Sequence, residues 1–237
     1  MPHRQPNFPF KNRVLASLPA AEIHELAQHL FPVTLEVPKT LLDAGEVISE
    51  AFFIEDGLAS IVVSMANGDS VEVGVVGREG MSGLPILFGT ESVPTHTFMQ
   101  ISGSGFRIQS DRMRLEYAKP GPLRTSLQNY LQTHLVQTSQ AAACNRLHEA
   151  EQRLAKWLLI CCDRTGSHHL PLTHEFIAQM LGTRRPTVTL AAGILHRAGL
   201  IEYSRGHVTI LDPHGLEEAA CECYRAIRKE SHRLHVL

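Results

Sequence analysis

The spacing of hydrophobic positions changes twice along the chain, and the changes divide it into three parts. Apolar residues recur at helical spacing over 13–31. From about 33 to 108, short runs such as SVEVGVVG alternate or concentrate β-branched residues between glycine and Asx turn signals. The segment Asn67-Gly68-Asp69 separates two of these runs and predicts a tight hairpin. The middle of the chain is therefore expected to be a compact antiparallel roll of short strands.

A helical period returns after the breaker Lys119-Pro120-Gly121-Pro122. It forms a narrow seam, made of Leu127, Leu131, His134 and Thr138. Such a seam suits packing against a partner helix, and pairing with its own copy would form a two-fold dimer. In the alternative interpretation the seam packs on the roll of its own chain.

Residues 174–193, HEFIAQMLGTRRPTVTLAAG, have the pattern of a helix-turn-helix. Ala178 is small where two crossing helices must approach closely. Gly182 falls where the turn needs a positive φ. Val188 follows as an apolar plug beneath the second helix. The other buried positions are expected to be Ile177, Leu181, Ala191 and Ile194.

The outward face of the second helix carries donors suited to phosphates and base edges. These candidate DNA-binding residues are Arg184, Arg185, Thr187 and Thr189. Pro186 is tolerated in the first turn, because the amide it lacks would have no intrahelical partner there.

A short hairpin is predicted directly after the second motif helix. Residues 200–203 and 207–211 are strand-like and flank Ser204-Arg205-Gly206, which is typical of the wing of a winged helix. Arg205 is a candidate contact to phosphates, and its alternative role is that of a solvated loop charge. Residues 215–237 predict one more amphipathic helix.

The net charge of −2 is unevenly distributed. Residues 1–142 hold 10 basic and 14 acidic side chains, whereas residues 143–237 hold 12 and 10. This asymmetry favours an acidic sensory half joined to a DNA-contacting half. No apolar run approaches the ~20 residues needed to span a bilayer, and residues 1–13 lack the apolar core of a signal peptide. A cytoplasmic location without membrane contact is therefore expected.

The five cysteines show no disulfide framework, which indicates a reducing compartment. They are Cys144, Cys161, Cys162, Cys221 and Cys223. The Cys221-x-Cys223 pair lies near His214 and has the chemistry for a metal or a redox role, but no second Cys/His pair stands at ligand spacing. No metal site is therefore expected. Cys144, near the end of the seam, is a candidate thiol switch.

The order and size of these parts resemble the CRP/FNR superfamily of bacterial transcription regulators. The stretches that carry the resemblance are LLDAGEVISEAFFIEDGLASIVVSMANGDSVEVGVVGREGMSG and LTHEFIAQMLGTRRPTVTLAAGILHRAGLIEYSRGHVTI. The resemblance implies an α+β fold with three parts: an N-terminal antiparallel double-stranded β-roll (jelly roll) at 1–120, a dimerisation helix at 121–146 and a C-terminal winged helix-turn-helix at 147–237.

The resemblance also implies a homodimer that binds a palindromic double-stranded DNA operator, with RNA polymerase as a further partner. Thr173, at the start of the first motif helix, and Thr187 resemble phosphate-contacting positions. Arg185 occupies the first of three base-reading positions, and a guanine contact is carried over to it. Pro186 and Leu190 replace the other two polar readers, so the half-site is expected to differ from that of the cyclic AMP-dependent members.

The roll departs from the cyclic AMP-binding members at the residues that hold the nucleotide. Met81 stands at or near the position of the ribose-binding glutamate, and 91–97 contain no arginine for the cyclic phosphate. A buried phosphate would lack its charge-assisted partners, so no cyclic AMP response and no cofactor are expected. The alternative is a haem-, metal- or small-molecule sensor, with His96 as a possible ligand. The effector is left open.

An iron–sulfur mechanism is disfavoured, because the first cysteine is Cys144 rather than one of an N-terminal cluster. An enzyme is not expected either. The chain has no P-loop, no Rossmann fingerprint and no Ser/His/Asp order, and the roll lacks the His-x-His pair of metal-dependent cupins.

Overall fold

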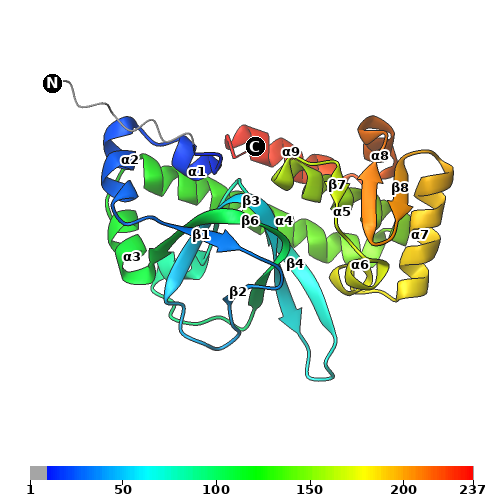
Figure 1. The fold of residues 1–237 in the computed structure, drawn as a ribbon, viewed down its shortest axis with the longest axis horizontal. Coiled ribbons are helices and arrows are strands. Elements are labelled where there is room, and N and C mark those ends of the chain that lie inside the picture. Colours follow the sequence, from blue (N-terminus) through cyan, green and yellow to red (C-terminus); the bar gives the residue numbers. More distant parts are fainter. Residues whose placement is uncertain (1–9, 237) are drawn as a thin grey trace.

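The computed structural model describes residues 10–236. Residues 1–9, which include the start of the predicted roll and most of the segment expected not to be a signal peptide, lie outside the described part. A roll of antiparallel strands and a smaller winged-helix unit lie at opposite ends of a long molecule, and helices run between them (Figure 1). This is the α+β arrangement expected from the sequence.

Six strands form the roll, and every pairing among them is antiparallel. The central path runs β1-β6-β3-β4, while β2 pairs with β6 and β5 with β3. The predicted hairpin joins β3 to β4, with Gly68 at φ 89° and the Asn67 side-chain oxygen accepting from Asp69 N at 3.1 Å. The strands are β1 (Phe31–Leu35), β2 (Thr40–Leu42), β3 (Glu50–Ser64), β4 (Ser70–Val76), β5 (Met81–Ser82) and β6 (His96–Gln109).

The helix predicted over 13–31 is divided in two. Pro19 has no amide hydrogen to continue the first helix and instead precedes the first residue of the second. These helices are α1 (Arg13–Ala16) and α2 (Ala20–Ala27), and a 3-10 turn, η1 (Leu84–Phe88), follows β5.

Three helices lead from the roll to the winged-helix part: α3 (Ser110–Ala118), α4 (Pro122–Leu147) and α5 (Ala150–Thr165). Only two residues separate α4 from α5. Glu149 begins α5 through a capping box with Gln152, in which each side chain accepts from the other residue's backbone amide. Four residues of α5 that recur at helical spacing are buried: Leu154, Trp157, Leu158 and Cys161.

The C-terminal part contains the predicted helix pair and hairpin, together with a third short strand. Its elements are β7 (His169–Leu170), α6 (His174–Met180), α7 (Arg185–Arg197), β8 (Ile201–Ser204), β9 (His207–Ile210), α8 (Pro213–Ala219) and α9 (Cys223–Arg233). The single helix expected after residue 215 is therefore two helices. The second, α9, returns to lie along α4, where Asn129 Nδ2 donates to Leu234 O at 3.3 Å (Figure 1).

The roll and the winged helix share one apolar core. Leu58, Val62 and Val75 of the roll belong to the same buried cluster as Trp157 and Leu158 of α5. No helix within residues 10–236 is long and apolar enough to cross a membrane.

Candidate nucleic-acid interface

The turn between α6 and α7 has the geometry that the sequence predicts. Gly182 adopts φ 59°, a left-handed conformation that costs other L-residues energy. Thr183 N donates to Ala178 O at 2.9 Å and closes the end of α6. Ala178 is buried at the helix crossing, and Val188 is buried beneath α7.

The buried stripe of the motif differs from the expectation at one position. Ile177, Leu181 and Ala191 are buried, but Ile194 is 38% exposed and Leu195 takes its place in the core. Val188, Ala192 and Leu195 are buried on one side of α7, because Ala192 follows Val188 by four residues and Leu195 follows Ala192 by three. Ile194 falls outside that side. Ile194 is therefore part of the outward surface.

The outward side of α7 begins with two arginines. Arg184 is the N-cap residue, and Arg185 opens the helix with Pro186 next to it, as predicted. Both arginines are exposed, and the nearest acid to the Arg185 guanidinium is Glu175, at 4.0 Å. Leu190 is 64% exposed on the same helix. The surface thus combines two cations with an apolar side chain.

The two threonines of α7 differ in how far their hydroxyl groups are available to a ligand. The Thr189 hydroxyl donates to Arg185 O at 3.1 Å and also lies 3.1 Å from His174 Nδ1. Its proton is therefore already used inside the motif. Thr187 is partly buried, so only part of its surface is open to a ligand.

Thr173 and the wing meet beside the first motif helix. Thr173 is the N-cap of α6, and its hydroxyl oxygen accepts from Phe176 N at 3.1 Å, which leaves its own proton free to donate. A Cβ added at Gly206 would lie 3.4 Å from the Thr173 methyl group. Arg205 and Gly206 form the hairpin tip, with φ values of 47° and 83°.

Sequence reasoning missed two residues that tie the motif to the wing. The His174 ring stacks on Tyr203 of β8 with centroids 3.8 Å apart, and His174 N donates to the Tyr203 hydroxyl at 3.2 Å. Burial, and then the charge of Arg185, lower the pKa of His174. A His at the start of a helix and a Tyr in a strand, 29 residues apart, give no sequence signal that they will meet.

The roll touches the motif directly through β4. Gln179 Nε2 of α6 donates to the Ser70 hydroxyl at 2.8 Å, and a Cβ at Gly182 would lie 2.9 Å from a methyl group of Val71. The turn of the helix-turn-helix is thus packed against the end of a roll strand.

The predicted seam of α4 faces the roll of its own chain. Leu127 has no exposed surface, and the His134 ring lies against Gly74 of β4, where an added Cβ would be 2.8 Å away. Burial, assisted by Arg164, lowers the pKa of His134 to about 4 and keeps the ring neutral. Within one chain, these contacts agree with the alternative interpretation, in which the seam of Leu127 and His134 packs on its own roll. Leu131 is only partly buried and Thr138 is exposed, so these two lie at the edge of the roll-facing side.

The region that corresponds to the nucleotide-binding segment is closely packed. Glu79 is buried, accepts from Gly77 N at 3.0 Å and pairs with the buried Arg164 of α5, whose Nε lies 3.3 Å away. The ring of Tyr130 covers Gly80 so tightly that an added Cβ would lie 2.0 Å from it. Charge and space are therefore both taken up by the chain's own side chains.

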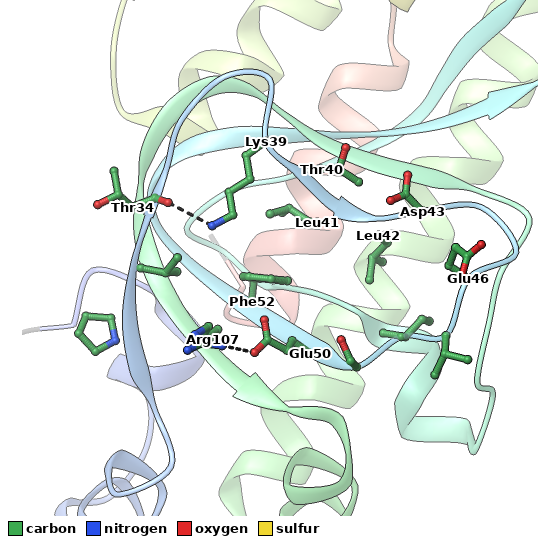
Figure 2. Close-up of a pocket in the computed structure, with 15 residues that line it drawn as sticks. Thr34, Lys39, Thr40, Leu41, Leu42, Asp43, Glu46, Glu50, Phe52 and Arg107 are labelled. Carbon is green, nitrogen blue, oxygen red and sulfur yellow. Dashed lines mark hydrogen bonds and ion pairs between the residues drawn. The ribbon is translucent and has the colours of Figure 1, made fainter.

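A separate cavity of about 630 Å³ lies between β1, β2 and the start of β3. Figure 2 shows Arg107 paired with Glu50, and Lys39 donating to Thr34 O at 3.4 Å, while Asp43 and Glu46 also line the cavity. His96 does not line this cavity. It pairs with Asp43 Oδ1 at 3.2 Å, and its side chain is about one-third exposed (32%).

A roll whose strand packs on the turn of a winged helix-turn-helix defines a class: DNA-binding regulators with a sensor-type domain. Comparison with known proteins agrees. A family model described as the Crp-like helix-turn-helix domain matches residues 152–219.

Relatives match over most of their length. The global nitrogen regulator of Synechococcus elongatus is 22% identical, over 82% of this chain and 93% of its own. The transcriptional regulator SdrP of Thermus thermophilus is 26% identical, over 75% and 91%. The solved structure of a CRP/FNR-family transcriptional regulator from Thermus thermophilus shares the fold, with a TM-score of 0.66 and 23% identity over 80% of this chain and 98% of that one.

Residues 152–219 form a Crp-like helix-turn-helix domain, and the chain as a whole is similar to DNA-binding transcription regulators of the CRP/FNR type. Its relatives are regulators rather than enzymes, in agreement with the expectation from the sequence.

Proposed function

We propose that two copies of this chain bind a palindromic double-stranded DNA operator, each placing α7 in a major groove. The observation that carries this is the exposed side of α7, where Arg184 and Arg185 are followed by Leu190. Arg185 donates to a guanine edge, Arg184 to phosphate, and Leu190 packs on a thymine methyl group. Phosphates on either side of the groove are contacted by Thr173, Thr187 and Arg205. The Thr189 hydroxyl donates to the backbone carbonyl of Arg185 and holds that residue in place.

The dimer forms through the side of α4 that neither the roll nor α9 covers. Leu135 is 54% exposed there, and it lies four residues after Leu131 and three before Thr138. This spacing continues a coiled-coil seam on the solvent side of the helix. Two winged helices joined in this way read half-sites about 34–36 Å apart.

The roll does not respond to cyclic AMP. Glu79 and Arg164 pair with each other, and Tyr130 fills the space beside Gly80, so a buried cyclic phosphate has neither room nor an unpaired cation. The output of the roll passes through β4 to the turn of the motif, by the contacts of Ser70 and Val71. An effector can act only by binding more tightly to one relative position of β4 and the motif turn than to another.

A small-molecule sensor is the second candidate, because the cavity of about 630 Å³ beside β1 and β2 is large enough for a ligand. Two of its charged groups, Arg107 and Glu50, are paired with each other, so a ligand with one carboxylate and one cationic group fits by exchanging partners. Thermal-shift screening of wild type against Arg107→Gln would detect such a ligand.

The main proposal is tested by selecting fragments from a randomised oligonucleotide pool at low salt, and by measuring the mass of the protein in solution. A dimer that retains an inverted repeat with half-sites one helical turn apart is the expected result. A strictly monomeric protein that retains no fragment would overturn it. Transcription in vitro from the selected site would test RNA polymerase as a partner.

A further inference from the structure

Four potential metal ligands from two distant segments meet where α4 ends. They are Cys144, His148, Cys221 and Cys223, and one ligand atom from each lies within 4.8 Å of all the others. Cys144 Sγ and Cys221 Sγ are 3.5 Å apart, and Cys223 Sγ is 3.7 Å from His148 Nδ1. All three cysteines are buried and carry free thiols. Among residues 10–236 this is the only group of its kind.

The Cys144–Cys221 and Cys223–His148 separations match those of tetrahedral coordination. Zinc binds thiolate sulfur at about 2.3 Å and imidazole nitrogen at about 2.0–2.1 Å, so the donor atoms around it stand about 3.5–3.8 Å apart. Cys144 and His148 are four residues apart at the end of α4, and therefore lie on one side of it. Cys221 and Cys223 approach from the start of α9.

The surroundings of His148 supply an independent observation. Its Nδ1 faces the sulfur atoms, while its Nε2 lies 3.1 Å from the carboxylate of Glu222, the residue between the two cysteines. A metal-bound histidine characteristically donates its other ring N–H to a carboxylate, which fixes the tautomer and the orientation of the ring. The contact between His148 Nε2 and the Glu222 carboxylate has the same arrangement.

A cation offsets part of the charge of the site. Three thiolates and a divalent cation leave one negative charge, to which the exposed Glu222 carboxylate adds a second, and the buried Lys156 of α5 interacts with Cys144. A buried net charge without a partner would be costly, whereas this one has a cation beside it.

We propose that Cys144, His148, Cys221 and Cys223 form a closed Cys₃His site for a divalent thiophilic cation, with zinc as the ion that fits. On binding, each thiol gives its proton to solvent and its sulfur forms a bond to the metal, so no electron is transferred. His214, which lies near the Cys221-x-Cys223 pair in the sequence, is highly exposed and is not part of the site.

The site lies at the junction between α4 and α5, so a bound ion would affect how these helices are held as well as the DNA-binding surface. His148 is the C-cap of α4, and α5 begins two residues later, so the ion would sit at the junction between the dimerisation helix and the winged helix. It would also fasten α9 to α4. We expect metal binding to fix this junction and to lower the amide hydrogen exchange of α9.

The first experiment measures metal content and involves no DNA. Full-length protein, reduced and incubated with zinc, is desalted and analysed for bound metal, and the same protein is titrated with cobalt(II). One zinc per chain, release of about three protons per zinc and the visible spectrum of tetrahedral thiolate-bound cobalt are expected. Failure of DNA binding would leave these readouts unchanged.

Variants assign the ligands. Cys223→Ser and His148→Asn should lose zinc and the cobalt spectrum, whereas the matched controls Cys162→Ser and His214→Asn should keep both. If a ligand variant does not fold, the wild-type titration still decides the question. Absence of a thiolate–cobalt spectrum, or a Cys144–Cys221 disulfide in place of bound zinc in the reduced preparation, would overturn the proposal.

Discussion

Trp157 Nε1 of α5 donates a hydrogen bond of 2.7 Å to the carboxylate of Glu72 on β4. This single contact joins the helix that supports the winged helix to the strand that touches its turn. The Ser60 hydroxyl lies 2.7 Å from the other Glu72 oxygen and 2.9 Å from Gln100 Oε1. One hydroxyl proton serves only one of these acceptors at a time, so the buried Glu72 carboxylate shares the Ser60 donor with Gln100.

The first prediction follows from this group. Burial, opposed by the bonds from Ser60 and Trp157 and by the charge of Lys156, raises the pKa of Glu72 from 4.5 to about 7. The folded state then holds a proton that the unfolded state releases, so the stabilisation is complete below pH ~4.5 and is lost as the pH rises through about 7. The loss is worth about 3 kcal/mol at most.

Glu72→Gln should remove this dependence while keeping an acceptor for Trp157. Denaturant unfolding of both proteins across this range should show wild type losing stability relative to the variant as the pH rises. Glu202→Gln, at an exposed position on the wing, is the control and should show a constant difference. A constant difference for Glu72→Gln as well would contradict the assignment.

The second prediction concerns base recognition. Arg185→Ala should flatten the preference at one base pair of each half-site, because a bidentate arginine–guanine contact discriminates by about 1–3 kcal/mol. Sequencing of selected fragments measures this. Arg114→Ala, on α3 of the roll, should leave the selected motif unchanged. An unaltered motif for Arg185→Ala would show that another group reads that base.

The third prediction separates stability from binding at the wing. Arg205 holds φ 47°, where a side chain other than Gly, Asn or Asp costs about 1 kcal/mol or more. Arg205→Asn should therefore keep or raise the melting temperature. It should also weaken operator binding and reduce the salt slope by about one for each phosphate that the side chain no longer neutralises.

Arg205→Lys provides the matched comparison, since it retains both the charge and the strained conformation. It should keep the salt slope of wild type. If Arg205→Asn bound the operator with an unchanged slope, Arg205 would be a solvated loop charge.

The fourth prediction tests the dimer. Leu135→Arg places a charge on the exposed side of α4 and should convert the dimer to monomers, as sedimentation velocity would show. Leu115→Arg, at a similarly exposed leucine on α3 (61% against 54%), should remain dimeric. If both variants had the same mass in solution, Leu135 would not be part of the dimer interface.

Local patterns were sufficient to predict the roll, the wing and the helix-turn-helix motif, although two of the predicted helices are each divided in the structure. The period of two in the roll, the Gly68 hairpin, the positive φ of Gly182 and the hairpin tip at Arg205 depend on neighbours along the chain. The motif residues Ala178 and Val188 are buried as expected for the same reason. Pro19 carried a break signal that the long helical period concealed.

Which side of a helix meets which partner was decided only by tertiary structure. The sequence favoured a dimer interface for the seam of Leu127 and His134, with packing on the roll as the alternative, and in the structure Gly74 of β4 lies against the His134 ring. Hydrophobic spacing specifies that a face is buried but not what covers it, because burial of apolar area is non-directional. The cysteines follow the same logic. Cys144 and Cys221 are 77 positions apart, and only the return of α9 along α4 brings their sulfur atoms together.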